Sequence, residues 1–336
     1  MANVQRPPVV VITGASAGVG RATARAFAAD SGARIGLIAR GRAGLEGAAD
    51  EVRQAGGDAL VLPCDVVDPD AVEAAAARVE EQFGPIDVWV NVAMTAVIGE
   101  VADTPPEEFR RVTEVTYLGA VHGAQAALRR MLARDQGKIV QVGSALGRRG
   151  IPLQATYCGA KHAVQGFVES LRTELMHHGS NVGLTIVQLP GLNTTQFTWV
   201  RARTPNRPRP VAPAYEPEVA ARAIVWAAAH NRREVWVGLP TCYTILGNRV
   251  APWVADRYLA MTGFKGQQTD QPVEPDRRDY LFAPLDDDED HGFRGPFSDE
   301  ARGSSVQLRL TMHRRALASV LAGAVATACV AVVRGS

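Results

Sequence analysis

Three side chains in the middle of the chain have the types and spacing needed to move a proton to or from an oxygen atom. Tyr157 and Lys161 are four residues apart in the stretch YCGAK, and Ser144 comes thirteen residues before the tyrosine. Positions i and i+4 of a helix share a face, so the ammonium can lie beside the phenol and lower its pKa from about 10. Such a phenol can exchange a proton with a carbonyl or hydroxyl oxygen, which Ser144 can also bind. Alone, the spacing is common, and most chance copies are a surface lysine beside a half-buried tyrosine.

A glycine-rich turn near the start of the chain gives this trio a context. Residues 8–13, PVVVIT, are typical of a buried parallel strand, and residues 21–29 are good helix formers. Between them stands GASAGVG, residues 14–20. Glycines let the backbone approach a ligand closely, and the free N–H groups at a helix start bind phosphate. The pattern predicts a unit that holds the pyrophosphate of a dinucleotide.

The elements that must position these residues alternate along the chain. Strand-like runs cover 34–39, 58–62, 86–91, 138–143, 182–188 and 234–238, and helical stretches cover 42–55, 69–83, 106–134, 155–178 and 217–230. This alternation predicts an α/β fold with a Rossmann-like, doubly wound parallel sheet, whose ligand lies at the carboxyl ends of the strands. Five candidate residues each follow an expected strand, so we expect them at one edge: Gly14, Asp65, Asn91, Ser144 and Pro190.

Together the two motifs resemble those of the short-chain dehydrogenase/reductase family, from about Pro8 to about Gly238. The matching stretches are TGASAGVG (13–20), CDV (64–66), NVAM (91–94), Ser144 with YCGAK, and PGLNTT (190–195). The resemblance implies that Ser144, Tyr157 and Lys161 are catalytic, with Thr116 as a fourth candidate in the proton path. It implies cofactor contacts from Gly14, Ser16, Gly18, Val19, Gly20, Arg40, Asp65, Val66, Asn91, Ala93, Tyr157, Lys161, Pro190, Gly191 and Thr195.

The function that follows is hydride transfer between a nicotinamide cofactor and an alcohol or carbonyl substrate. Tyr157 exchanges the proton, Ser144 orients the substrate oxygen and, by the resemblance, Lys161 holds the nicotinamide ribose. Three positions depart from the family pattern. Thr116, in VTYLG, stands where the family has an asparagine that supports a proton relay, and Val92 and Met94 alter the usual NNAG. The alternative is therefore a catalytically weak nucleotide-binding or scaffold protein with the same fold.

The choice of cofactor depends on the end of the second expected strand. NAD-binding folds commonly carry a carboxylate there for the ribose 2′-hydroxyl, whereas this chain has Ala39 followed by Arg40. The Arg40 guanidinium can pair with a 2′-phosphate, helped by Arg42 and Ser16. The sequence therefore favours NADP(H) over NAD(H), unless Arg40 is only a solvated loop residue.

The chain divides into one catalytic domain and two further segments. The domain covers 1–262, with its core at about 8–238 and a substrate-cover region at about 190–262. Apolar residues at helical spacing in 239–261 suit either a cover over a hydrophobic substrate or a helix that packs on the core or a second subunit. Residues 263–312 form an irregular, acidic, Pro/Gly-rich extension, which we expect to dock residues 280–282, to be partly disordered and to leave the acidic run 286–290 solvated.

The last segment, 313–336, is expected to be an apolar helix. Residues 316–333 carry no charge and follow the basic stretch HRR. Since a bilayer span takes about twenty apolar residues, this run is a marginal membrane anchor that would keep the catalytic domain on the cytoplasmic side. The competing interpretation is a soluble helix that packs on the body or on a partner.

Composition excludes several other classes of protein. At 336 residues with a net charge of +1, the chain lacks the basic excess of a nucleic-acid binder. Its 4 cysteines are widely spaced, which predicts neither a metal site nor a disulfide framework and favours a reducing compartment. The resemblance also implies that helices 106–134 and 155–178 pack against copies of themselves in a homodimer or homotetramer.

Overall fold

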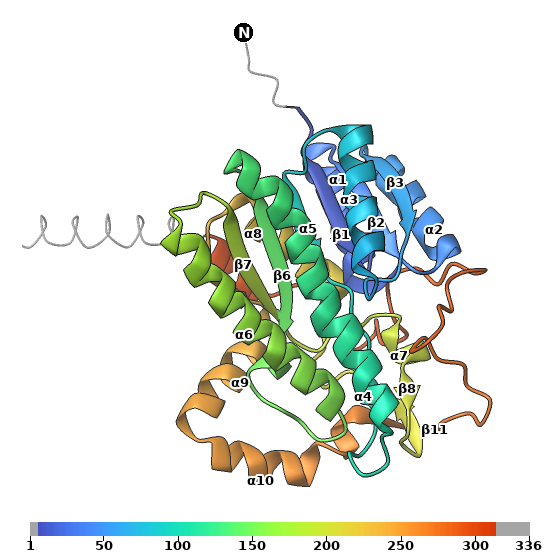
Figure 1. Cartoon of the computed structure of the whole chain (residues 1–336). Helices are drawn as coiled ribbons and strands as arrows, with labels where there is room; N and C mark the ends of the chain where they lie inside the picture. Colours follow the sequence, from blue (N-terminus) through green and yellow to red (C-terminus); the bar gives the residue numbers. More distant parts are fainter. Residues whose placement is uncertain (1–5, 314–336) are drawn as a thin grey trace, which may run out of the picture.

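The fold is built on a seven-stranded parallel sheet (Figure 1), in a computed structural model that describes residues 6–313. The strands are β1 Val9–Thr13, β2 Arg34–Ala39, β3 Asp58–Pro63, β4 Val88–Asn91, β6 Lys138–Ser144, β7 Gly183–Leu189 and β10 Glu234–Trp236. They lie in the order β10-β7-β6-β4-β1-β2-β3. The direction of winding therefore reverses between β1 and β4, the point at which such sheets bind ligands. The predicted doubly wound fold is confirmed.

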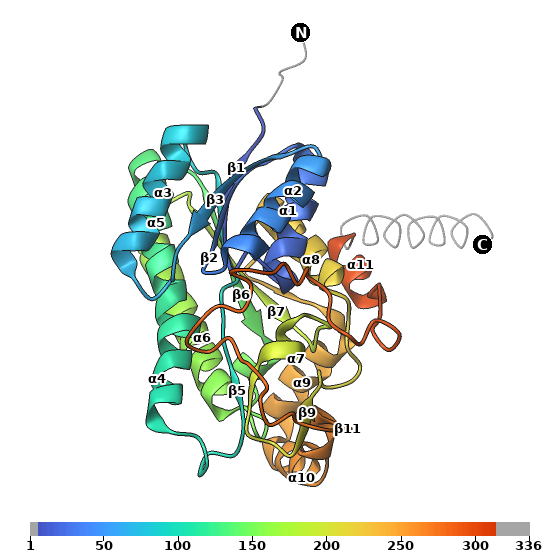
Figure 2. The same ribbon diagram turned by 90° about the vertical axis from the view of Figure 1, so that its right-hand side faces the viewer.

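Helices cover both faces of this sheet (Figure 2). One face carries α1 Gly18–Ser31, α2 Arg42–Gln54 and α8 Pro217–Ala229, and the other carries α3 Pro69–Phe83, α5 Gly119–Arg134 and α6 Ala155–His177. Each layer seals its own apolar cluster, one with Phe27 and Ile224 and the other with Trp89 and Met131. All five residues of β1 are buried, because helices pack on both of its sides.

The helix expected over 106–134 is interrupted. It consists of α4 Pro106–Thr113, a π-helical turn over Glu114–Leu118 (η1) and then α5. A π-helical turn accommodates one extra residue, and such turns are frequent at functional sites. Here it places Val115 in the wall of the cleft described below.

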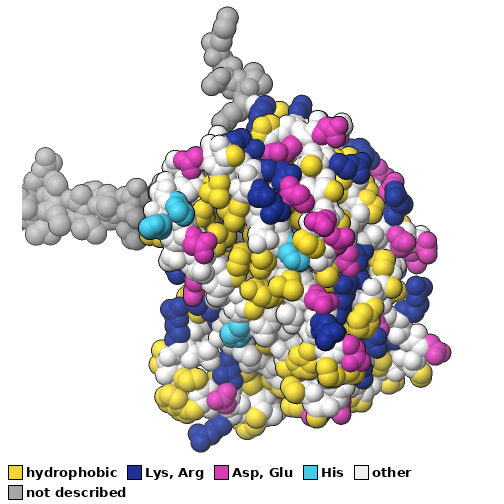
Figure 3. Space-filling model, viewed as in Figure 1, with side chains coloured by type: hydrophobic (Ala, Val, Ile, Leu, Met, Phe, Trp, Pro, Cys, Tyr) yellow, Lys and Arg dark blue, Asp and Glu magenta, His cyan; other side chains and the backbone are white. Residues whose placement is uncertain are grey.

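Short elements close the carboxyl end of the sheet. Three are helices: α7 Gln196–Trp199, α9 Gly238–Val250 and α10 Pro252–Thr262. Two are short strand pairs, β5 Val97–Ile98 with β8 Arg201–Ala202 and β9 Asn206–Pro208 with β11 Gln268–Pro272. A last helix, α11 Val306–Met312, follows further along the chain. None of the residues of α10 is buried, and Trp253, Val254 and Met261 are exposed. Hydrophobic side chains gather along the lower edge of the molecule in Figure 3, where Figure 1 shows α10.

Residues 279–290, which we call the strap, run past the end of β2 toward α1 (Figure 2). Leu281 is fully buried, whereas Phe282, which was expected to dock, is half exposed. The acidic run was expected to be solvated, and this was wrong for one of its residues, Asp286. Asp286 is buried, and Asp290 forms an ion pair with the buried Arg21.

The expected apolar helix at 316–333 lies outside the described residues. Within residues 6–313, no helix combines the length and the apolar character that a membrane span requires.

The N-terminal cap of α3 allows a test of how much one local residue contributes to the stability of a helix. The Asp68 carboxylate accepts hydrogen bonds from the backbone N–H groups of Asp70 and Ala71, each at 3.0 Å. We expect Asp68→Ala to lower the free energy of unfolding by about 1 kcal/mol, because both donors lose their cap. Asp68→Asn, which caps equally well, serves as the control in urea denaturation. Equal stability of the alanine and asparagine variants would show that the cap contributes nothing.

Candidate active site

The glycine-rich turn brings the start of α1 against the end of β1. Gly14 has a φ of +71°, a backbone conformation that residues with a side chain rarely adopt. A Cβ added to Gly20 would overlap the carbonyl oxygen of Gly14, so only glycine permits this approach. The first turn of α1 has neither a capping side chain nor an acidic residue. Its N–H groups are thus suited to a phosphate, and the turn fits the pyrophosphate of a dinucleotide.

A cavity of about 500 Å³ lies at this edge of the sheet. The predicted site residues that line it are Gly14, Ser16, Gly18, Val19, Gly20, Arg40, Asp65, Val66, Ala93, Ser144, Tyr157, Lys161, Pro190, Gly191 and Thr195. They come from loops after β1 to β4, β6 and β7 and from the first turns of α6, as the convergence of parallel strand ends requires. Asn91 and Thr116 do not line it.

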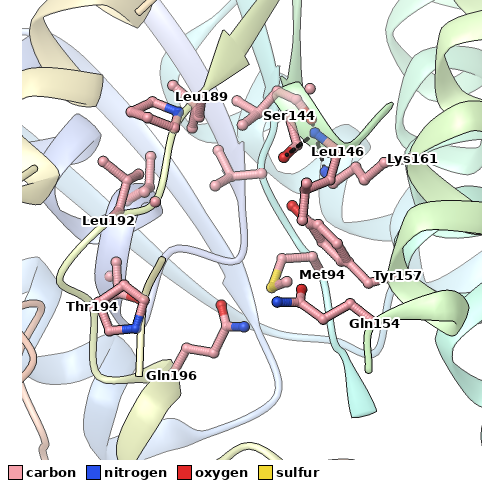
Figure 4. Close-up of a pocket in the computed structure, with 18 of the residues that line it drawn as sticks. Met94, Ser144, Leu146, Gln154, Tyr157, Lys161, Leu189, Leu192, Thr194 and Gln196 are labelled. Atoms are coloured by element: carbon pink, nitrogen blue, oxygen red, sulfur yellow. Dashed lines mark hydrogen bonds between the residues drawn. The ribbon is translucent and has the colours of Figure 1, made fainter. Parts of the chain in front are cut away.

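Ser144, Tyr157 and Lys161 lie together on one side of the cavity, opposite Leu192 and Thr194 (Figure 4). The Lys161 Nζ atom is 5.7 Å from the centre of the Tyr157 ring and donates to the Val142 carbonyl oxygen at 2.8 Å. Ser144 ends β6, and its hydroxyl accepts from the Leu146 N–H group at 3.1 Å. A serine on a strand end and two side chains one helical turn apart thus converge on one point.

Burial dominates the electrostatics of this trio. It raises the pKa of Tyr157 above its usual value, against the smaller opposing effect of the nearby Ser144 hydroxyl. It lowers the pKa of Lys161 to about 8. The sequence had led us to expect a tyrosine pKa lowered by the lysine charge, but removal of both groups from water has the larger effect. At neutral pH Tyr157 is therefore a neutral proton donor beside a charged Lys161.

Asn91 and Thr116 lie outside the cavity wall and hydrogen-bond the elements that form it. The Asn91 amide donates to Gln141 Oε1 at 3.0 Å, and its oxygen accepts from Trp89 Nε1 at 2.8 Å, which ties β4 to β6. The Thr116 hydroxyl donates to the Thr95 carbonyl oxygen and accepts from the Thr95 N–H group, both at 3.0 Å. Both side chains hold the loop after β4 and its neighbours in place.

At the end of the cavity next to β2, the predicted contacts are shared with the strap. Arg40 Nη1 donates to the Phe282 carbonyl oxygen at 3.0 Å, and Nη2 donates to that of Tyr280. The Asp65 carboxylate forms an ion pair with Arg111 at 2.6 Å. Sequence reasoning missed Arg111, because its role depends on a strap that docks from far along the chain.

The other end of the cavity is aromatic and apolar. Its walls there include Met94, Phe197, Trp199, Tyr243, Tyr258, Leu259 and Tyr280. Figure 4 places Met94 and Gln154 beside Tyr157. Sequence reasoning also missed Gln154, whose amide donates to Gln267 Oε1 at 2.7 Å and so joins the loop before α6 to the extension.

No cluster of three or more His, Cys, Asp or Glu side chains able to hold a metal ion is found in the described part of the chain.

Comparisons with known proteins agree with this geometry. The family model described as short chain dehydrogenase matches residues 8–205. An uncharacterized oxidoreductase of Bacillus subtilis (strain 168), YxnA, is 31% identical over 95% of this chain and 89% of its own length. Dehydrogenase/reductase SDR family member 7B of Bos taurus is 38% identical, over 57% of this chain and 60% of its own length.

A solved structure is also similar. It is a metagenomic short-chain oxidoreductase in complex with NADP, with a TM-score of 0.58 and 28% identity, over 68% of this chain and 96% of that one. Together with the family model and YxnA, it agrees with the Rossmann-like sheet. This chain therefore belongs to the short-chain dehydrogenase/reductase family, oxidoreductases that act on CH–OH groups with a nicotinamide cofactor.

Proposed function

We propose that this protein interconverts an alcohol and a ketone or aldehyde, with Tyr157 as the group that gives and takes the proton. The observation that carries the proposal is the place of Tyr157. Its hydroxyl lies with Ser144 in the same cavity as the glycine-rich turn, one helical turn from Lys161. The proton donor and the glycine-rich turn proposed to bind the dinucleotide thus line the same cavity.

Each residue has a separate task in this reaction. The nicotinamide, when bound, supplies or accepts the hydride. Ser144 orients the substrate oxygen by a hydrogen bond, and Tyr157 delivers a proton to that oxygen during reduction or removes it during oxidation. Lys161, charged below about pH 8, would hold the nicotinamide ribose hydroxyls by hydrogen bonds.

A hydrophobic substrate fits the far end of the cavity. Trp199, Tyr258 and Leu259 line it, and the chain segments that carry them fold over the carboxyl edge of the sheet. Apolar walls with a few polar groups are usual for sites that bind small apolar molecules. Of the two interpretations of residues 239–261, this favours the substrate cover.

The nucleotide preference has arguments on both sides. The position of Arg40 at the end of β2 supports NADP(H), and the similar metagenomic enzyme is in complex with NADP. The guanidinium, however, already donates to two strap carbonyl oxygens, and the buried Asp286 carboxylate lines the same cavity. The preference therefore depends on which charge faces the adenosine ribose.

A second candidate function is a nucleotide-binding protein of low activity. It is favoured by Thr116, whose hydroxyl is committed to Thr95 and does not reach the cavity. Nucleotide oxidation measured against a panel of hydrophobic ketones and aldehydes separates the two. Nucleotide binding without turnover across that panel would support the second candidate.

A homo-oligomer is proposed from the family resemblance. The helices concerned carry the exposed apolar residues Leu118, Leu132 and Met176. Light scattering during size exclusion measures the state directly, and a monomer would contradict the proposal.

The general acid role of Tyr157 predicts the effect of removing its hydroxyl. We expect Tyr157→Phe to lower kcat by about 10²- to 10⁴-fold, the usual contribution of a positioned acid or base. The dissociation constant of the nucleotide should stay within about twofold, because the ring is kept. Tyr117→Phe, at a tyrosine that does not line the cavity, is the control and should keep most activity. Full turnover by Tyr157→Phe would remove the assignment.

The lowered pKa of Lys161 predicts the dependence of activity on pH. The ammonium is fully charged below about pH 8 and loses its proton as pH rises through that value. We therefore expect kcat/KM of the nucleotide, which reports groups of the free enzyme, to fall tenfold per pH unit above about 8. Steady-state carbonyl reduction from pH 6 to 10 measures this. A flat profile up to pH 10 would contradict the role of Lys161.

The segment 313–336 predicts a membrane tether on the grounds of sequence alone. If it anchors the chain, a full-length preparation should require detergent, and deletion of residues 313–336 should remove that requirement. Detergent-free behaviour of the full-length protein would contradict the anchor.

A further inference from the structure

We propose that Asp286, a residue of the strap, makes this protein select NAD(H) over NADP(H). The inference deepens the proposed function and rests on it, because it concerns the nucleotide bound in the same cavity. It replaces the preference for NADP(H) that the sequence around Arg40 predicts. What carries it is the place of one buried carboxylate.

The Asp286 carboxylate lies between the start of α2 and the glycine-rich turn. A Cβ added to Gly41 would overlap Asp286 Oδ1. A Cβ added to Gly44 would lie 2.7 Å from Asp286 Oδ2 and 3.0 Å from the Cβ atom of Ser16. Asp286 is only 7% exposed, and it lines the same cavity as Arg40. Within residues 6–313, no ion pair or side-chain hydrogen bond engages this carboxylate, so its oxygens are available to a ligand.

The strap also occupies the donors that a 2′-phosphate would use. At the start of α2, the Arg42 N–H group donates to Asp287 Oδ1 at 3.0 Å, and the Ala43 N–H group donates to the Asp287 carbonyl oxygen at 3.1 Å. The Gly44 N–H group donates to the Asp286 carbonyl oxygen at 2.9 Å. A helix start is a common binding site for phosphate, but this one is already capped by the chain itself.

Arg40, the cation expected to hold the phosphate, is engaged as well. Its guanidinium donates to the carbonyl oxygens of Tyr280 and Phe282. Burial and the nearby charge of Arg111 lower the pKa of Arg40, while Asp286 is among the groups that oppose this shift. A 2′-phosphate placed here would therefore meet a buried negative charge, with the nearest cation already bound.

A ribose 2′-hydroxyl has the opposite requirements. A carboxylate accepts hydrogen bonds only, which matches a hydroxyl donor. Dinucleotide-binding folds usually supply this acceptor from the end of the second strand. In this chain that place is Ala39, and the Asp286 carboxylate reaches the adjoining space from the C-terminal part of the chain.

The strap is fixed on both sides of Asp286, so the carboxylate has a defined position. Before it, Leu281 is fully buried, and its carbonyl oxygen accepts from Arg111 Nε at 3.0 Å. After it, Asp290 pairs with the buried Arg21, which also binds Glu51 at 2.8 Å. The strap is thus anchored to the body of the protein on both sides of the Asp286 charge.

The test measures equilibrium binding of NADH and NADPH to the full-length protein by fluorescence titration, at one pH and ionic strength. We expect the wild-type protein to bind NADH at least about tenfold more tightly than NADPH, because like charges brought together disfavour a ligand strongly. Asp286→Asn should reduce that ratio by about tenfold or more, mainly through tighter NADPH binding. Asp288→Asn, which removes the same charge from an exposed neighbour, is the matched control and should leave the ratio unchanged.

Each outcome decides the proposal. Tighter binding of NADPH than of NADH by the wild-type protein would overturn it, as would an unchanged ratio in a folded Asp286→Asn variant. If that variant does not fold, the wild-type ratio alone decides. Failure of the wild-type protein to bind either nucleotide would instead overturn the proposed function, while binding with the reverse preference would leave that function intact.

Discussion

The whole site depends on the contact between the first turn of α1 and the end of β1. Because Gly20 has no side chain, the helix start can lie against the Gly14 carbonyl oxygen, and its free N–H groups then point into the crevice where the strand order reverses. Thr13 secures the neighbouring wall, since its hydroxyl accepts from the N–H groups of Val92 and Ala93 at 3.1 and 3.2 Å.

At the end of the cavity that holds Tyr157 and Lys161, burial is the effect that sets the protonation states. Tyr157 and Lys161 are both taken out of water, and each is thereby shifted toward its neutral form. Burial therefore brings the pKa of Lys161 closer to neutral pH. It moves the pKa of Tyr157 further from neutral pH. Such a pair holds its proton on the phenol, which suits donation to a carbonyl oxygen.

The sequence predicted the sheet well because its signals are local. The run RIGLIA at 34–39 is β2 without a change of bounds, and the helix expected over 69–83 is α3 with the same bounds. The glycine turn and the Ser144, Tyr157 and Lys161 trio were likewise found from spacing. The π-helical turn at Glu114–Leu118 was not, because one extra residue in a helix leaves no compositional trace. The carboxylate at the ribose end was missed for a different reason. It comes from an acidic run that looks solvated, and only the docking of Leu281 and Asp290 reveals where it lies.

The strap also bears on how the molecule is made. The seven strands of the main sheet and the helix that carries Tyr157 and Lys161 are complete once residue 236 has been synthesised, whereas the strap extends to residue 290. A nascent chain can therefore assemble its sheet and its reactive side chains while the wall beside β2 is still missing. The crevice acquires its final outline only when the last part of the polypeptide folds back across it, so a chain stopped shortly after β10 would carry the chemistry with a different opening for the nucleotide.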